Sequence, residues 1–123
     1  MTKKQSTGIK RILNAFVHSK DGFISAFKSE IAFRQDLLIF AVFTLIAAVL
    51  NISLWHKFVL ISVLLFILFA ELVNTAIETL VDRISTDYHK LSKKAKDIGS
   101  MLVLMSFINA IMWWCIVLFM DFM

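Results

Sequence analysis

The chain has 123 residues, of which 59% are hydrophobic and only 18% are charged, and its mean hydropathy is +0.81. A soluble domain of this length cannot hide so much apolar side chain, because a small domain has a high ratio of surface to volume. The formal net charge of +4 fits attraction to anionic lipid headgroups. The composition therefore excludes an ordinary soluble domain and favours a single membrane domain, residues 1–123.

Residues 9–34 are expected to form a surface helix region. Apolar residues recur at the spacing of one helix face, at Ile9, Ile12, Leu13, Phe16 and Val17. The opposite face is basic, and a basic amphipathic helix ahead of a membrane span is typical of a helix that lies on the lipid surface. Gly22 is expected to interrupt this helix.

Three transmembrane helices are predicted, over about 37–54, 58–82 and 98–120. About 20 apolar residues are needed to cross a bilayer core, and the first and third stretches meet this length without internal charge. The second qualifies only if Glu71 lies near its inner end. His56 and Lys57 are expected to form a short outer turn, and residues 85–96 a polar loop. The predicted fold class is therefore all-α, an integral membrane protein.

The distribution of lysine and arginine predicts the orientation. Residues 1–36 contain seven of these residues, the first turn contains one, and the second loop together with Arg83 just before it contains five. Because cytoplasmic segments carry the excess of basic residues, the N-terminus is expected in the cytoplasm and the C-terminus outside. The basic residues flank spans, so nucleic acid is not expected as a partner.

One helix face carries the most informative polar residues. Glu71 follows thirteen uncharged residues, 58–70, and a charge at the bilayer centre costs about 2.5–3.5 kcal/mol. At about 100° per residue, Glu71, Asn74, Glu78 and Asp82 share one narrow stripe. Glu71 and Glu78 are about 10 Å apart along the helix axis, which suits two separate tasks in one cleft. Asn74 fits helix packing as well as function, whereas the glutamates favour function, because burying two unpaired carboxylates is costly.

These acids, together with nearby basic residues, indicate phosphoryl chemistry at the inner membrane surface. Mg²⁺ takes oxygen ligands, typically one or two carboxylates with phosphate oxygens, and Glu30 and Glu78 are the best-placed candidates. The charge of a transferred phosphate could be balanced by Arg11, Arg34, Lys94 and Lys96. The sequence contains none of the familiar glycine-rich nucleotide motifs or kinase signatures, so an ATP site here must be built in another way.

Four segments in order resemble the bacterial integral-membrane diacylglycerol kinase family. They are E-I-A-F-R-Q at 30–35, E-L-V-N-T-A-I-E at 71–78, V-D-R-I at 81–84 leading to Tyr88-His89, and K-A-K-D-I-G-S at 94–100. The resemblance extends from Gly8 to Trp114. It implies a homotrimer in the bacterial inner membrane, with sites shared between subunits. It also implies transfer of the γ-phosphate of Mg-ATP to the hydroxyl of diacylglycerol, giving phosphatidic acid.

The resemblance assigns roles residue by residue. Glu71 matches the catalytic base, Glu30 and Glu78 match the Mg²⁺ ligands, and Asn74 is a supporting residue. Positions on the ATP side are Arg11, His18, Glu30, Glu78, Asp87, Tyr88, His89, Lys96 and Asp97. Positions on the lipid side are Arg11, Ala32, Phe33, Arg34, Gln35, Glu71, Ser100 and Trp114. His18 stands where a tyrosine is commoner, and Asp36 stands where a longer acid is found.

Two other functions fit parts of the pattern. A sister enzyme that phosphorylates undecaprenol would use the same chemistry, although the E-I-A-F-R-Q segment favours diacylglycerol. A small proton-coupled transporter or an assembly subunit could use Glu71 as its membrane carboxylate. The second alternative leaves Glu30, Glu78 and Asp97 without a role.

Overall fold

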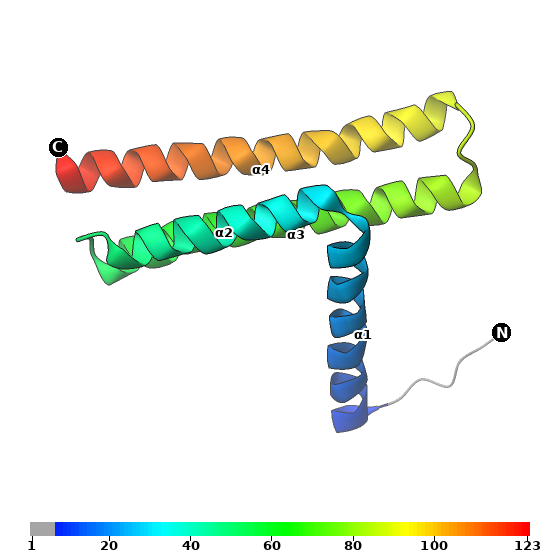
Figure 1. Cartoon of the computed structure of the whole chain (residues 1–123), viewed down its shortest axis with the longest axis horizontal. Helices are drawn as coiled ribbons and strands as arrows, with labels where there is room; N and C mark the ends of the chain where they lie inside the picture. Colours follow the sequence, from blue (N-terminus) through cyan, green and yellow to red (C-terminus); the bar gives the residue numbers. More distant parts are fainter. Residues whose placement is uncertain (1–6) are drawn as a thin grey trace.

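The computed structural model describes residues 7–123 and contains four helices in that range: α1 (Gly8–Ser29), α2 (Ile31–Val49), α3 (Leu54–Ile84) and α4 (Lys90–Phe122). The helices α2, α3 and α4 run side by side, and α1 projects from one end of them (Figure 1). Each of these three is long and apolar enough to cross a membrane. The predicted all-α fold with three candidate spans is therefore confirmed. Lys3 and Lys4, which enter the charge count, lie outside the described residues.

The break between α1 and α2 lies at Glu30 and not at Gly22, so the predicted interruption is wrong. Helix α1 runs through Gly22, since one glycine inside a helix costs only about 1 kcal/mol. At Glu30 the backbone is extended, with φ −116° and ψ 109°. Arg34 Nη1 donates hydrogen bonds to the carbonyl oxygens of Phe27 at 2.6 Å and Lys28 at 3.2 Å. These bonds satisfy carbonyls that the end of α1 leaves free. The four residues after Glu30, predicted in the surface region, belong to α2.

The outer turn also differs from the prediction. His56 and Lys57 are already in the first turn of α3, and the connection is made by residues 50–53. Ser53 caps α3, because its Oγ accepts a hydrogen bond from the backbone N–H of His56 at 3.2 Å. Lys57 Nζ donates to the carbonyl oxygen of Ala48 at 2.7 Å, at the end of α2. The cap begins α3, and the Lys57–Ala48 bond links its first turn to the end of α2.

The inner connection is shorter than the predicted loop 85–96. It covers residues 85–89, and α4 begins at Lys90. His89 precedes the helix and its Nδ1 accepts a hydrogen bond from the backbone N–H of Leu91 at 3.0 Å. This side chain satisfies one of the N–H groups that every helix start leaves free, so the helix can begin before the apolar run does.

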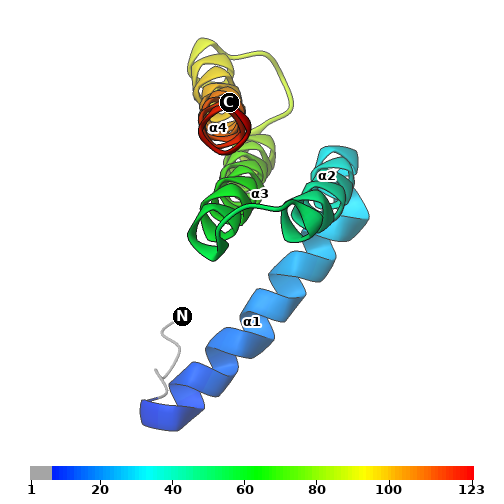
Figure 2. The same cartoon turned by 90° about the vertical axis from the view of Figure 1, so that its left-hand side faces the viewer.

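Helix α3 forms the core of the bundle, because it packs against both α2 and α4. Figure 2 shows these two helices on different sides of α3. The apolar core consists of three clusters of buried residues, centred on Val63, Leu64, Ile67 and Ala110, on Ala26, Phe33 and Leu68, and on Ala47, Leu60 and Val117. Many other large apolar side chains are exposed along the outside, which is the arrangement expected of helices that face lipid.

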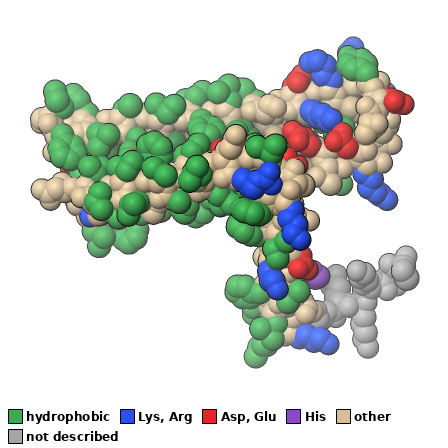
Figure 3. Space-filling model, viewed as in Figure 1, with side chains coloured by type: hydrophobic (Ala, Val, Ile, Leu, Met, Phe, Trp, Pro, Cys, Tyr) green, Lys and Arg blue, Asp and Glu red, His purple; other side chains and the backbone are tan. Residues whose placement is uncertain are grey.

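Charged side chains gather at one end of the bundle. Figure 3 shows acidic and basic groups around the α3–α4 connection and along α1, while the long body of the bundle is covered by apolar groups. The opposite end carries a separate ion pair between His56 Nδ1 and Asp121 Oδ2 at 2.7 Å. The charged end is therefore the place where polar chemistry meets the apolar bundle.

Candidate active site

Glu71 lies where the apolar part of α3 meets the charged end. Its side chain is 7% exposed. Asp36 on α2, Glu78 and Glu30 lie near enough for their charges to act on it. Acids from α2, from α3 and from the α1–α2 junction therefore surround one buried carboxyl group. The sequence predicted Glu71 and Glu78 on one helix face and Glu30 as a separate candidate, and the fold brings Glu30 near Glu71.

Asp36 was not among the predicted site residues, yet it is as buried as Glu71, at 7% exposed. It lies on the same face of α2 as Phe33 and Phe40, which pack into the core. Asp36 follows Phe33 by three residues and precedes Phe40 by four. This helical spacing is the sequence signal that could have placed Asp36 on the inner face of α2. Its Oδ2 atom is buried and has no hydrogen-bond partner among the described residues.

Asn74, one turn after Glu71 on α3, is hydrogen-bonded to Glu78 in the following turn. Its Nδ2 donates to Glu78 Oε1 at 3.3 Å, and its side chain is buried. Its Oδ1 points at Gly99 on α4, so closely that a Cβ atom at residue 99 would overlap it. Gly99 therefore permits the close approach of α4 to the acidic stripe. The role of this glycine, in the K-A-K-D-I-G-S segment, is visible only in the fold.

The acids offer oxygen ligands for a metal, but not a complete cage within one chain. In residues 7–123 no three acidic, histidine or cysteine side chains are grouped closely enough to hold a metal ion by themselves. Mg²⁺ is usually held by one or two carboxylates together with phosphate oxygens. Glu78 engages one oxygen with Asn74. The pair Glu30 and Glu78 fits such a site in its chemistry.

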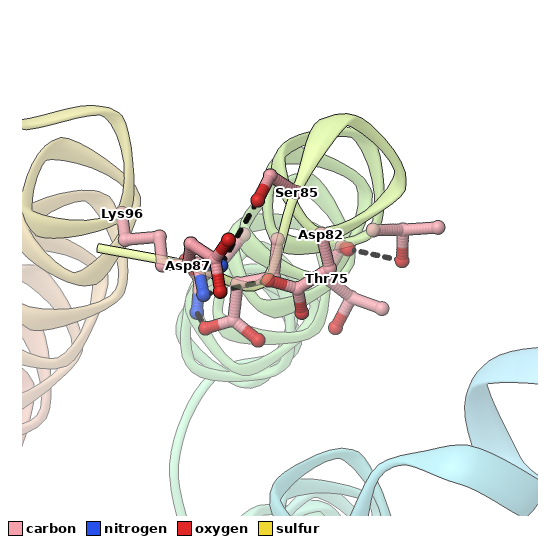
Figure 4. A network of polar contacts seen from close by, with 8 residues as sticks. Thr75, Asp82, Ser85, Asp87 and Lys96 are labelled. Carbon is pink, nitrogen blue, oxygen red and sulfur yellow. Dashed lines mark hydrogen bonds and ion pairs between the residues drawn. The ribbon is translucent and has the colours of Figure 1, made fainter. Parts of the chain in front are cut away.

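A polar hollow of about 430 Å³ lies beside the α3–α4 connection. Its lining includes five residues predicted on the ATP side: Asp87, Tyr88, His89, Lys96 and Asp97. Figure 4 shows this region, with Lys96 reaching from α4 toward Asp82 on α3. The hollow therefore combines residues 87–89, which are neighbours in the sequence, with Lys96 and Asp97 from α4.

The lysines around this hollow form ion pairs with nearby carboxylates. Lys96 Nζ lies 2.8 Å from Asp82 Oδ1, and Lys93 Nζ lies 2.6 Å from Asp97 Oδ2. The four side chains are 43–62% exposed, and pairs so exposed contribute only about 0–1 kcal/mol. An anionic ligand could therefore displace the carboxylates at little cost.

Other predicted residues lie apart from the hollow within one chain. Arg11 and His18 are exposed on α1, whose start is distant from the α3–α4 connection in both Figures 1 and 2. On the lipid side, Ala32 and Gln35 are exposed, while Phe33 is only 1% exposed and Arg34 caps α1. The structure thus brings together the residues of α3 and α4 but not those of α1.

Ser100 and Trp114 lie at different depths. Ser100 follows Gly99 at the charged end and is exposed, whereas Trp114 is about 20 Å further along α4, at about 1.5 Å per residue. Trp114 packs edge-on against Phe43, with ring centroids 5.4 Å apart, beside an apolar groove of about 420 Å³. Its Nε1 is buried without a partner in the described part of the chain.

The sequence of this chain is similar to those of known proteins along most of its length. Residues 17–118 match the family described as prokaryotic diacylglycerol kinase. The chain is 48% identical over 97 residues to the diacylglycerol kinase of Pseudomonas aeruginosa, a match that covers 79% of each chain. It is 39% identical over 117 residues to that of Escherichia coli, covering 95% of this chain and 96% of the relative. The Haemophilus influenzae diacylglycerol kinase is 36% identical over 116 residues, covering 94% and 98%.

Proposed function

The chain belongs to the prokaryotic diacylglycerol kinase family, and from this premise we propose that it transfers the γ-phosphate of Mg-ATP to the free hydroxyl of diacylglycerol, giving phosphatidic acid. The observation that carries this proposal is the position of Glu71. It is a buried carboxyl group at the point where an apolar helix meets a charged surface. A lipid hydroxyl, held at headgroup level while its chains remain in the bilayer, meets the protein at this depth.

Glu71 acts as the general base in the proposed reaction. The hydroxyl proton moves to the Glu71 carboxylate while the hydroxyl oxygen forms a bond to the γ-phosphorus. The bond from that phosphorus to the oxygen bridging the β- and γ-phosphates breaks, and ADP leaves with the electron pair. Glu71 then releases its proton to water. No covalent intermediate on the protein is needed.

The nucleotide is proposed to lie in the hollow beside the α3–α4 connection. Its lining carries hydrogen-bonding groups of Asp87 and His89 and the aromatic ring of Tyr88. Lys96 can turn from Asp82 toward a phosphate, because its exposed ion pair contributes little. Glu30 and Glu78 would hold Mg²⁺, which neutralises charge on the phosphates when bound. Asn74 keeps Glu78 in place through its hydrogen bond.

The site is proposed to be completed by a second subunit in a homotrimer. Within one chain Arg11 and His18 lie on α1, whose start is distant from the α3–α4 connection (Figures 1 and 2). A neighbouring copy can supply these residues to the ATP side without any change in the fold of either chain. We further propose that the protein lies in the bacterial inner membrane with its N-terminus in the cytoplasm, where ATP is available. The N-terminal segment carries seven basic residues and the connection between the second and third spans carries five, and such residues are enriched on the cytoplasmic side.

Phosphate transfer from labelled ATP in mixed micelles tests the activity. Diacylglycerol, undecaprenol and a lipid without a hydroxyl are offered in parallel, and the labelled lipid is separated by chromatography. Labelled phosphatidic acid is expected. Labelling of undecaprenol alone would assign the sister activity, and the absence of label from every lipid alcohol would contradict kinase function.

Glu71→Gln tests the base. The neutral amide keeps the shape and is cheaper to bury than a carboxylate, so folding should survive. We expect kcat to fall by about 10²–10⁴-fold with little change in the KM for ATP, because the base touches the acceptor and not the nucleotide. Asp21→Asn, the same chemical change on exposed α1, serves as the control. A Glu71→Gln enzyme with more than about a tenth of the wild-type kcat would exclude the general-base role.

A further inference from the structure

Lys93 lines the polar hollow beside the α3–α4 connection, and the proposed mechanism gives it no role. The charged side chains in the lining are two lysines, Lys93 and Lys96, and two aspartates, Asp87 and Asp97. Lys93 Nζ lies 2.6 Å from Asp97 Oδ2, one helical turn further along α4, and the lysine side chain is 61% exposed. This ion pair places an accessible ammonium group at the wall of the hollow.

The balance of charge in the hollow depends on Lys93. The phosphate groups of a nucleotide are anionic, and the carboxylates of Asp87 and Asp97 repel them. Lys96 is also bonded to Asp82, at 2.8 Å, and Asp82 lies outside the lining of the hollow. Without Lys93 the lining would therefore carry an excess of negative charge. An ammonium group has three N–H donors, so Lys93 can keep one on Asp97 and direct another to a phosphate oxygen.

The position of Lys93 along α4 indicates which phosphates it can reach. Helices α3 and α4 run in opposite directions (Figure 1), and Gly99 lies level with Asn74, whose Oδ1 it approaches closely. Lys93 precedes Gly99 by six residues, about 9 Å along the axis, and Glu71 lies about 4.5 Å beyond the Asn74 level in the other direction. Lys96 is one turn nearer to Glu71. With the transferred phosphate at Glu71, Lys93 faces the part of the nucleotide that remains as ADP.

We propose that Lys93 is a further nucleotide-binding residue, which contacts the phosphates that ADP retains. The inference rests on the proposed function, because it assumes that the nucleotide lies in this hollow with its γ-phosphate toward Glu71. Lys93 then strengthens the binding of ATP and of ADP alike, through charge-assisted hydrogen bonds. It does not touch the transferred phosphate, so it acts on nucleotide affinity and not on the chemical step.

Lys93→Gln tests this role, because it removes the charge from an exposed side chain of similar length. Equilibrium binding in mixed micelles should show the Kd of Mg-ATP and that of ADP both rising by about 3–30-fold. Binding of adenosine, which has no phosphate, and kcat should change little. Lys93→Arg keeps the charge and should bind ATP nearly as wild type does. Lys90→Gln is the matched control, because Lys90 is an exposed lysine one turn earlier on α4 that does not line the hollow.

Chemical labelling gives a second measurement that does not depend on substitution. An amine-acetylating reagent, followed by digestion and mass spectrometry, reports how accessible each lysine is. ATP and ADP should protect Lys93 from the reagent, whereas adenosine should not, and Lys90 should be labelled equally in all three cases. A lysine that only supports the fold of α4 would show no such dependence on the phosphates of the ligand.

The possible failures are distinguishable. Normal binding by Lys93→Gln, or weaker binding of ATP with unchanged binding of ADP, would overturn the assignment. Equal weakening in Lys90→Gln would reduce the effect to the general charge of the surface and would also overturn it. Either result beside a wild-type protein that phosphorylates diacylglycerol would remove only the role of Lys93. A wild-type protein that neither binds ATP nor labels a lipid alcohol would contradict the proposed function, and the role of Lys93 would fall with it.

Discussion

The close approach of α4 to Asn74 provides a prediction that follows from the fold alone. A methyl group at residue 99 would overlap Asn74 Oδ1 and would also contact Ile77 Cδ1 at 3.6 Å. Either Asn74 must turn away from Glu78 or α4 must shift. Overpacking of this kind costs about 1–3 kcal/mol. Alanine also favours the helix over glycine by about 0.5–1 kcal/mol, so the two effects oppose each other and the clash should win.

Gly22→Ala separates these two effects. Gly22 is also helical, but nothing lies within 4 Å of the position that a Cβ atom would take. Gly22→Ala should therefore be neutral or stabilised by up to about 1 kcal/mol, while Gly99→Ala should be destabilised. Unfolding in mixed micelles by added denaturing detergent, followed by circular dichroism, measures both. The difference between the two variants reports the overpacking.

The same substitution should impair the site through Asn74. Loss of the Asn74–Glu78 hydrogen bond, which spans 3.3 Å, removes about 0.5–1.5 kcal/mol of support from Glu78. We expect kcat/KM for Mg-ATP to fall by about tenfold or less. In the double variant Gly99→Ala/Asn74→Ala the overlap disappears, so the stability cost of Gly99→Ala should shrink in that background. A Gly99→Ala protein with wild-type stability and activity would refute the reasoning, because Asn74 would then be free to move aside.

Three further predictions concern the metal, the orientation and the outer ion pair. Glu78→Gln should fold normally but require much more Mg²⁺ for activity, and normal activity at low Mg²⁺ would exclude Glu78 as a ligand. A cysteine at Met123, which is 88% exposed, in a Cys115→Ser background should label from outside intact spheroplasts; labelling only after permeabilisation would reverse the proposed orientation. A double-mutant cycle with His56→Ala and Asp121→Ala should give a stabilising coupling of about 0.2–1 kcal/mol, because the 2.7 Å pair joins α3 to α4. A coupling of zero would contradict this prediction.

The periodicity of the sequence predicted much of the site, because its residues lie on single helices. Glu71, Asn74 and Glu78 repeat with the helical period, so their common face follows from about 3.6 residues per turn. The residues of the hollow, 87–89 and 96–97, were predicted by the resemblance to a known family and not by periodicity, because residues 87–89 lie between α3 and α4. Local helix geometry is therefore sufficient only for the stripe on α3, and the ligands of both groups stay predictions.

Helix ends were less accessible to sequence reasoning. Apolar content located the three spans, but the break at Glu30 depends on Arg34 reaching back to the carbonyl groups that end α1. The start of α3 depends in the same way on the cap that Ser53 provides. Such side-chain bonds shift a boundary by several residues without altering the overall hydrophobic pattern.

The composition was enough to determine a helical protein suited to lipid, and the apolar stretches located its three candidate spans. The helical period placed an acidic stripe on the second span. Which faces meet across the helices was decided only by the tertiary structure. Asp36 lies near Glu71, Gly99 admits Asn74, and His56 pairs with Asp121, each across a separation of more than 20 residues. The hydrophobic period states which face of a helix is buried, but the rotation and axial shift between two packed helices depend on how their side chains interlock.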